Sequence, residues 1–231
     1  MLPPSIIERV LRRRGKLNIL DSLPSQKTAL LAIDLQNAYL AEDQPGYFQG
    51  GRRIIGNVNR LAAAVRARSG FVVWIRNTLG IEVLQQWPVY NGLRREGVRE
   101  DMLRALAEGS PGHQLWAELD VGEQDLVLNK RRYSAFISGS SNIDAQLRAR
   151  SVDTLIIAGV LANVCCESTA RDAMMLNYHV VMAADATAAH TQDELVATLA
   201  NILFAFGDVM DTDEIIERLS DHVAEKDVPN L

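Results

Sequence analysis

Short apolar runs of strand length recur along the chain, and segments with helical periodicity separate them. The run Leu155-Ile156-Ile157-Ala158 has no polar alternation, which is typical of a strand buried on both faces of a sheet. Strands that alternate with helices form mostly parallel sheets with right-handed crossovers. The sequence therefore predicts an α/β fold: one three-layer, Rossmann-like domain with a six-stranded sheet and helices on both faces. The predicted strands cover 28–33, 71–75, 125–128, 153–158, 180–184 and 209–210.

Apolar residues at helical spacing predict the helices between these strands. Thr191 and Glu194 have the spacing of a capping box, and Thr212 is the expected cap of the last helix. We expect a helical N-terminal extension over 1–26 and a single domain over 27–231. The stretch 80–122 has no clean strand and is expected to form either a lid or a subunit interface. The expected helices cover 5–14, 52–69, 99–107, 142–151, 165–177, 190–206 and 213–219.

Charge and cysteine content exclude several classes of protein. The formal net charge is −5 and the pI is about 5.4, which argues against nucleic acid as a partner. No apolar run approaches the roughly 20 residues that span a bilayer, so no membrane role is expected. The two cysteines, Cys165 and Cys166, are adjacent and too close to pair within the chain. With no secretory signal recognised, we expect a cytoplasmic protein.

Three reactive side chains follow or end separate predicted strands: Asp34, Lys130 and Cys165. The carboxyl ends of parallel strands share one edge of the sheet, so these residues can converge. Cys165 then suits a nucleophile, Asp34 a general base, and Lys130 a cation that keeps the carboxylate charged and lowers the thiol pKa. A position near a helix start also favours a thiolate. The alternative is that Cys165 is a small buried packing residue.

The segments around these residues resemble the isochorismatase-like cysteine hydrolases. The matching stretches are Leu31-Ala32-Ile33-Asp34-Leu35-Gln36-Asn37, Lys130-Arg131-Arg132-Tyr133-Ser134-Ala135-Phe136 and Ala158-Gly159-Val160-Leu161-Ala162-Asn163-Val164-Cys165. The resemblance extends over roughly 28–219 and makes 27–231 an isochorismatase-like hydrolase domain. It implies a catalytic triad of Asp34, Lys130 and Cys165. It also implies a cis peptide at Val160-Leu161 and an oxyanion hole formed by the backbone N–H groups of Leu161 and Cys165.

Within this family the chain looks most like the C–N hydrolases that include ureidoacrylate amidohydrolase, N-carbamoylsarcosine amidohydrolase and streptothricin hydrolase. The resemblance implies an amidohydrolase that cleaves a small amide or ureide through a thioester. It implies a homodimer or homotetramer, and no cofactor. The similar nicotinamidases carry an Asp-x-His metal motif after the first strand. Because no histidine precedes His113 here, we expect no metal.

Several candidate residues have a structural alternative. Asn77 is a candidate for binding a substrate amide or for a loop turn, and Tyr39 and Phe136 for lining the pocket or for packing beneath loops. Cys166 is read as a packing residue, with a redox role as the alternative. Two other functions stay open: vinyl-ether hydrolysis of the isochorismate type, which would not need Cys165, and a catalytically silent binding or redox-sensing protein on the same fold.

Overall fold

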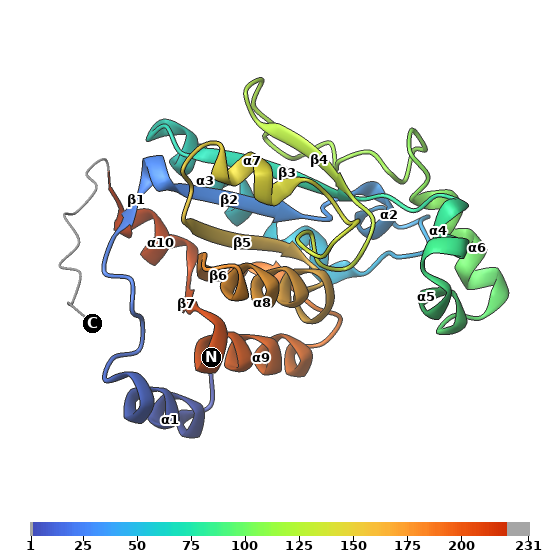
Figure 1. Cartoon of the computed structure of the whole chain (residues 1–231). Helices are drawn as coiled ribbons and strands as arrows, with labels where there is room; N and C mark the ends of the chain where they lie inside the picture. The colour runs from blue at the N-terminus through green and yellow to red at the C-terminus, as the bar shows by residue number, and fades with distance from the viewer. Residues whose placement is uncertain (1, 221–231) are drawn as a thin grey trace.

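The computed structural model describes residues 2–220, and its centre is a six-stranded parallel sheet in the order β4-β3-β2-β5-β6-β7 (Figure 1). This confirms the predicted fold class. The strands are β2 (Thr28–Ile33), β3 (Phe71–Asn77), β4 (Leu126–Lys130), β5 (Thr154–Val160), β6 (His179–Ala188) and β7 (Asp208–Met210).

The strand order reverses between β2 and β5. From β2 the chain proceeds outward through β3 to β4, and it then returns to place β5 on the other side of β2. Every residue of β2 and β5 is buried, as their continuous apolar sequences predict. Ligands of open α/β sheets bind at the carboxyl ends of the strands beside such a reversal. The reversal therefore marks where a site is expected.

Helices cover both faces of the sheet. The core on one face includes side chains of α3 (Ile55–Ala67) and α10 (Thr212–Arg218). The core on the other face includes side chains of α7 (Ile143–Arg148), α8 (Glu167–Met175) and α9 (Gln192–Asn201). A 3₁₀ helix, η2 (Gln49–Ile54), precedes α3, and π-helical turns η3 (Ala162–Cys166) and η4 (Ile202–Phe206) adjoin α8 and α9.

Two predicted boundaries differ from the structure. The cap of α10 is Asp211, whose side chain accepts a hydrogen bond from the Glu214 N–H, and not Thr212. Strand β6 does not end at Asp185 but continues to Ala188, past a shift in register against β5. Asp185 Oδ1 accepts hydrogen bonds of 2.8 Å from the backbone N–H and hydroxyl of Thr212. The predicted capping box of Thr191 and Glu194 is confirmed.

The stretch 80–122 holds three short helices, which Figure 1 shows grouped beyond one end of the sheet. They are α4 (Glu82–Gln86), α5 (Pro88–Gly92) and α6 (Glu96–Ala105). They build a third, smaller core that includes Leu79, Tyr90 and Leu106. The sequence predicted only α6, because α4 and α5 are too short to show helical periodicity. A single turn, α2 (Asn37–Leu40), follows β2.

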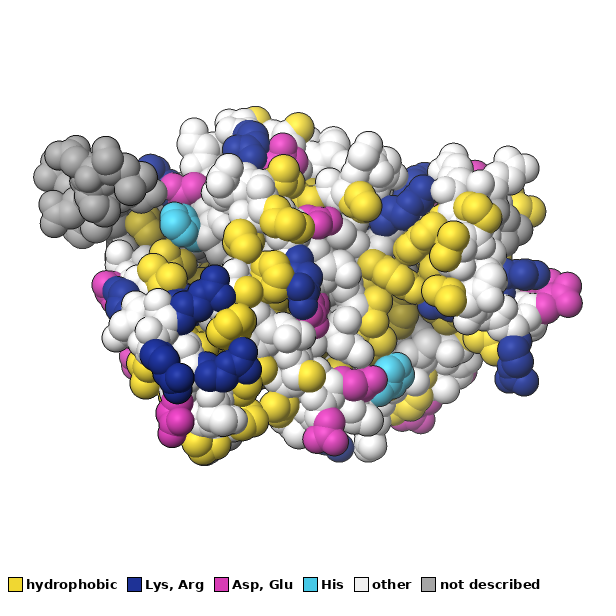
Figure 2. Space-filling view, turned by 60° about the horizontal axis from the view of Figure 1, so that its bottom comes forward, with side chains coloured by type: hydrophobic (Ala, Val, Ile, Leu, Met, Phe, Trp, Pro, Cys, Tyr) yellow, Lys and Arg dark blue, Asp and Glu magenta, His cyan; other side chains and the backbone are white. Residues whose placement is uncertain are grey.

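The N-terminal segment runs along the outside of the domain. Helix α1 (Pro4–Arg14) lies apart from the sheet in Figure 1 and exposes Arg9, Arg12 and Arg13, on a face where Figure 2 shows basic side chains gathered. Further on, β1 (Leu23–Pro24) pairs with β8 (Leu219–Ser220) in a separate two-stranded sheet. None of the helices within residues 2–220 has the length and apolar character to cross a membrane.

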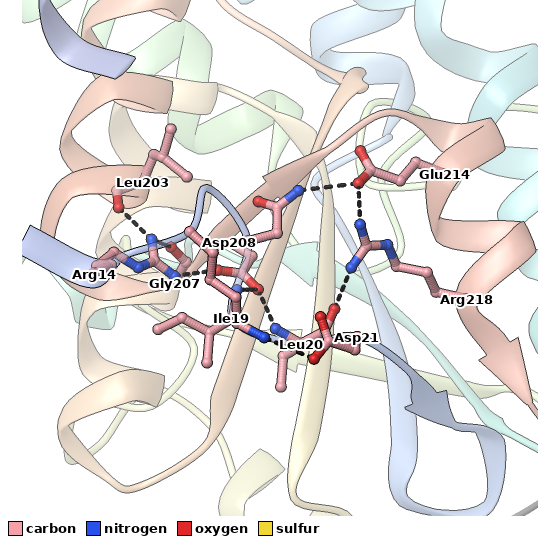
Figure 3. Close-up of polar contacts among 11 residues, drawn as sticks. Arg14, Ile19, Leu20, Asp21, Leu203, Gly207, Asp208, Glu214 and Arg218 are labelled. Carbon is pink, nitrogen blue, oxygen red and sulfur yellow. Dashed lines mark hydrogen bonds and ion pairs between the residues drawn. The ribbon is translucent and has the colours of Figure 1, made fainter. Parts of the chain in front are cut away.

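The buried side chain of Asp208 anchors this segment (Figure 3). Arg14 forms an ion pair with Asp208 Oδ1 and donates to the carbonyl oxygens of Leu203 and Gly207. Asp208 Oδ2 accepts from the backbone N–H groups of Ile19 and Leu20 at 2.7 and 2.8 Å. We call these contacts the Asp208 anchor. They attach the chain between α1 and β1 to the start of β7.

Candidate active site

Asp34 follows β2 in an unusual backbone conformation. Its φ is +57°, in the left-handed region that side chains other than those of Gly, Asn and Asp seldom adopt. Its N–H donates to the Ile75 carbonyl of β3 at 2.8 Å, and its side chain is buried. Gly159 of β5 lies against the same turn, because a Cβ at that position would be 2.1 Å from the Ile33 carbonyl oxygen. The absence of a side chain at Gly159 therefore lets β5 approach the backbone next to Asp34.

Lys130 is the last residue of β4, and its side chain is fully buried. Its Nζ lies 2.9 Å from Asp34 Oδ2 and 3.3 Å from Cys165 Sγ, and it also donates to the Arg132 carbonyl at 3.1 Å. Lys130 thus touches both other members of the predicted triad. The structure brings together three residues that lie far apart in the sequence.

Cys165 lies in the π-helical turn η3 that precedes α8, and not in the first turn of an α-helix. The peptide bond Val160-Leu161 is cis, as predicted. The Leu161 carbonyl accepts hydrogen bonds from the N–H groups of Val164 and Cys166, which fold the turn back on itself. Cys166 is completely buried in the core between the sheet and α8, in agreement with a packing role.

The pKa of the Cys165 thiol is raised above its ordinary value. Burial raises its pKa, the carboxylate of Asp34 raises it further, and the charge of Lys130 offsets only part of the increase. This differs from the expectation that Lys130 and a helix start would lower the thiol pKa. Burial also raises the pKa of Asp34, which Lys130 partly counteracts. Burial lowers the pKa of Lys130, but Asp34 and Cys165 outweigh it, so the pKa is raised and the amine stays charged.

Asn77 and Tyr39 form one hydrogen-bonded unit beside the triad. Asn77 Nδ2 donates to the Tyr39 hydroxyl at 2.8 Å. The fully buried Gln36, which sequence reasoning did not single out, holds this unit in place. Its Nε2 donates to the carbonyls of Asn77 and His113, and its Oε1 accepts from the Asn77 N–H at 2.7 Å. The signal was present in the segment 31–37, where Gln36 lies two residues after Asp34.

Phe136 packs against Tyr178 and is not part of the unit formed by Asn77 and Tyr39. Its ring lies 5.5 Å from that of Tyr178, whose hydroxyl donates to Asp144 of α7. The structure thus shows Phe136 in contact with the helical layer, and its role in substrate binding stays a prediction.

His190 packs against the ring of Phe48, at 4.9 Å between centroids. Within residues 2–220, no group of three or more His, Cys, Asp or Glu side chains is placed to hold a metal ion.

Known proteins share this architecture. The family model described as the isochorismatase domain matches residues 28–214. Ureidoacrylate amidohydrolase RutB of Klebsiella pneumoniae is 34% identical over 213 residues, which cover 86% of this chain and 89% of that protein. The protein of the same name from Variovorax paradoxus is 34% identical over 179 residues, covering 72% of this chain and 70% of its own.

Solved structures show the same fold. A cysteine hydrolase from Pseudomonas syringae superposes with a TM-score of 0.76 at 27% identity, covering 88% of this chain and 98% of that one. An N-carbamoylsarcosine amidase from Thermoplasma acidophilum superposes with a TM-score of 0.64 at 23% identity, covering 81% and 97%. The latter likeness concerns the fold alone.

Proposed function

Because the chain belongs to the isochorismatase family, we propose that it is a cysteine-dependent hydrolase that cleaves a C–N bond of a small amide or ureide. The observation that carries this proposal is the contact of one buried lysine with both a carboxylate and a thiol. Lys130 Nζ lies 2.9 Å from Asp34 and 3.3 Å from Cys165. A nucleophile, a base and a cation within contact distance, buried from water, are the parts that covalent acyl transfer needs.

Asp34 acts as the proton carrier. Since the pKa of the thiol is raised, Cys165 holds its proton at neutral pH until attack. As Sγ bonds to the carbonyl carbon, the Asp34 carboxylate takes the thiol proton. Asp34 then returns that proton to the leaving nitrogen, the C–N bond breaks, and a thioester remains on Cys165. Water, deprotonated by Asp34, hydrolyses the thioester and restores the thiol.

Lys130 and the turn η3 stabilise charge. Lys130 keeps the carboxylate of Asp34 ionised in a buried site, which makes it available as a base. We propose that the N–H groups of Leu161 and Cys165 bind the oxyanion of the tetrahedral intermediate. The fold of η3 supports this. The Leu161 carbonyl accepts hydrogen bonds from the N–H groups of Val164 and Cys166, the residues on either side of Cys165.

The names of the relatives point to ureido compounds as the substrates to test first. We propose a small linear amide or ureide, with Asn77 and Tyr39 among the residues that contact it. A homodimer or homotetramer is the proposed assembly. Largely exposed apolar side chains of the stretch 80–122, Ile81, Val89 and Leu93, are candidates for burial between subunits. The cytoplasm as its location, and the division into an extension over 1–26 and a hydrolase domain over 27–231, also remain proposals.

Two alternatives remain distinguishable. Vinyl-ether hydrolysis would use Asp34 and Lys130 without the thiol, although the sulfur lies in contact with Lys130. A silent binding protein would use none of the three for turnover. The names of the relatives favour C–N hydrolysis over both.

The test is ammonia release from a panel of ureides and primary amides, starting with ureidoacrylate, together with the appearance of a free amine from lactams. Cys165→Ala should lower kcat at least about 10³-fold, because the covalent step is lost. The adjacent cysteine supplies the matched control. Cys166→Ala should stay within about threefold of the wild-type kcat and lose about 1 kcal/mol of stability, since it removes only a buried sulfur. Full turnover by Cys165→Ala would exclude the mechanism, and no turnover on any substrate would exclude the activity.

A further inference from the structure

An aromatic cluster of two side chains from the stretch 80–122 and one from the loop after β4 lies next to the triad. Trp87 stacks on Tyr90 with centroids 4.6 Å apart, and Tyr133 meets both rings, at 4.9 Å from Trp87 and 5.9 Å from Tyr90. Tyr133 follows Arg132, whose carbonyl accepts from Lys130 Nζ. Burial raises the pKa of Tyr90 to about 12. The nearby Cys165 also raises this pKa, and the charge of Lys130 lowers it. The cluster of Trp87, Tyr90 and Tyr133 therefore borders the reacting groups.

Arg94 is held on this cluster by the flat face of its guanidinium. The guanidinium carbon lies 4.0 Å from the centroid of the Tyr90 ring. Two of its nitrogens reach the Tyr133 hydroxyl, at 3.4 and 3.5 Å, which are long contacts for hydrogen bonds. A guanidinium has five N–H donors in a planar fork. Stacking on Tyr90 therefore fixes the plane of the fork and leaves most of its donors free for a ligand.

The charge of Arg94 has no carboxylate to balance it. Two nearby arginines do have one, since Arg131 pairs with Glu82 and Arg171 with Glu167, both at 2.5 Å. Arg132, which lies over the Trp87 ring, donates instead to the carbonyls of Arg131 and Gln86. Among residues 2–220, no acidic side chain forms an ion pair with Arg94. Burial lowers the pKa of Arg94, but the hydroxyls of Tyr133, Tyr90 and Tyr39 outweigh it, so the side chain stays cationic. A half-buried cation without a partner carries a desolvation cost that an anionic ligand would offset.

We propose that Arg94 binds the carboxylate of the substrate, so that the enzyme acts on anionic amides or ureides in preference to neutral ones. This rests on the proposed function and narrows its substrate class. The planar fork matches a carboxylate in a bidentate arrangement. The negative charge of Asp34 is already balanced by Lys130, so a second carboxylate nearby meets a positive environment. The competing interpretation is that Arg94 only clamps Tyr90 and Tyr133 together.

A charged and a neutral ureide of similar length separate these interpretations. The probes are 3-ureidopropionate and (3-hydroxypropyl)urea, in which a neutral alcohol replaces the carboxylate. Arg94→Gln should lower kcat/KM for 3-ureidopropionate about 30- to 100-fold, the value of a charge-assisted hydrogen bond, and for the alcohol by less than about threefold. Arg94→Lys should lie between the two, because it keeps the charge but loses the fork.

The exposed neighbour Arg95 provides the control for net charge. Arg95→Gln removes the same charge one residue away and should change neither kcat/KM by more than about twofold, because salt screens exposed charges. An equal loss on both probes in Arg94→Gln would show a clamp and overturn the proposal. A loss in Arg95→Gln as large as in Arg94→Gln would attribute the effect to the overall field and also overturn it.

Binding to the inactive variant keeps this proposal separate from the proposed function. Calorimetry with 3-ureidopropionate should show binding to Cys165→Ala that weakens at least about 30-fold in Cys165→Ala/Arg94→Gln. If wild type hydrolyses neither the probes nor any substrate of the panel but the difference in binding persists, the activity is wrong and the carboxylate site stands. If hydrolysis proceeds and both variants bind 3-ureidopropionate equally well, the carboxylate site is wrong and the activity stands. Failure of 3-ureidopropionate to bind Cys165→Ala would overturn the carboxylate site.

Discussion

Two buried carboxylates in this protein each face one cation, and their surroundings differ. Asp208 accepts from Arg14 and from the backbone N–H groups of Ile19 and Leu20, so both of its oxygens are occupied. Asp34 pairs with Lys130 at 2.9 Å, and its other neighbours are the thiol of Cys165 and the backbone of Asn77, both of which lower its pKa. One carboxylate holds backbone segments together, and the other faces a thiol that can give it a proton.

The contrast shows that a buried ion pair does not reveal its role through burial or distance. A saturated carboxylate fixes chain segments in place, because any movement would leave a charge or donor unpaired. A carboxylate buried beside a thiol costs stability through desolvation, and such a cost is common where a group must react. The Asp208 anchor should therefore govern folding and the triad should govern turnover.

The largest expected effect comes from Asp34→Asn. An amide of the same shape cannot take the thiol proton, so kcat should fall about 10²- to 10⁴-fold on any substrate that the wild type hydrolyses. Asp208→Asn should leave kcat within about twofold, measured on the folded fraction, because Asp208 lies in the Asp208 anchor and not in the site. Equal losses of activity in the two variants would contradict the separation of roles.

Removing the cation of the Asp208 anchor should act on stability. Arg14→Met leaves the carboxylate of Asp208, with a side chain only 2% exposed, without its counter-ion. We expect a loss of about 3 kcal/mol in the free energy of unfolding, measured by urea titration, with little change in kcat/KM. Arg12→Met is the matched control, because Arg12 is exposed on the same helix. Unchanged stability in Arg14→Met would show that the Asp208 anchor contributes nothing.

The pH dependence of activity should depend on Asp34. Burial raises the pKa of Asp34 above the ordinary value of 3.8, so the base becomes protonated as pH falls through that raised value. We expect kcat/KM to fall about tenfold per pH unit below it, with the acid limb above pH 3.8. Lys130 adds no alkaline limb below its ordinary value of 10.5, because its pKa is raised. Asp208→Asn should retain the acid limb, and an identical limb in Asp34→Asn would assign it to another group.

The smallest effect is expected at the edge of the Asp208 anchor. Arg218 donates to the Leu20 carbonyl and pairs with Glu214 at 2.6 Å, and both contacts are visible in Figure 3. Its side chain is 25% exposed, so solvent screens the pair. Arg218→Gln should cost about 0.5–1 kcal/mol in urea unfolding and leave kcat unchanged. A loss as large as that in Arg14→Met would make Arg218 an equal part of the anchor.

Residue patterns predicted the sheet because its central strands are apolar without interruption. They also brought Asp34, Lys130 and Cys165 to one edge, since parallel strands end together. The prediction that β6 ends at Asp185 was wrong. A carboxylate often follows a strand end, but here Asp185 lies at a register shift within β6 and accepts a hydrogen bond from Thr212. The position of Arg94 on Tyr90 was not predictable, because packing between short irregular helices leaves no periodic trace in a sequence.

Strand β1 pairs with β8, which the ribosome makes much later, so this contact forms late in synthesis. Arg14 and Asp208 are 194 positions apart, so a ribosome adding about 5–20 residues per second needs about 10–40 s to make the second after the first. Through that interval the amphipathic α1 emerges with no Asp208 or β8 to receive the segment behind it. The nascent chain can assemble β2 and β3 early, while the segment after α1 waits until Asp208 and β8 have been made. A chaperone that binds emerging chains would find α1 accessible throughout this interval.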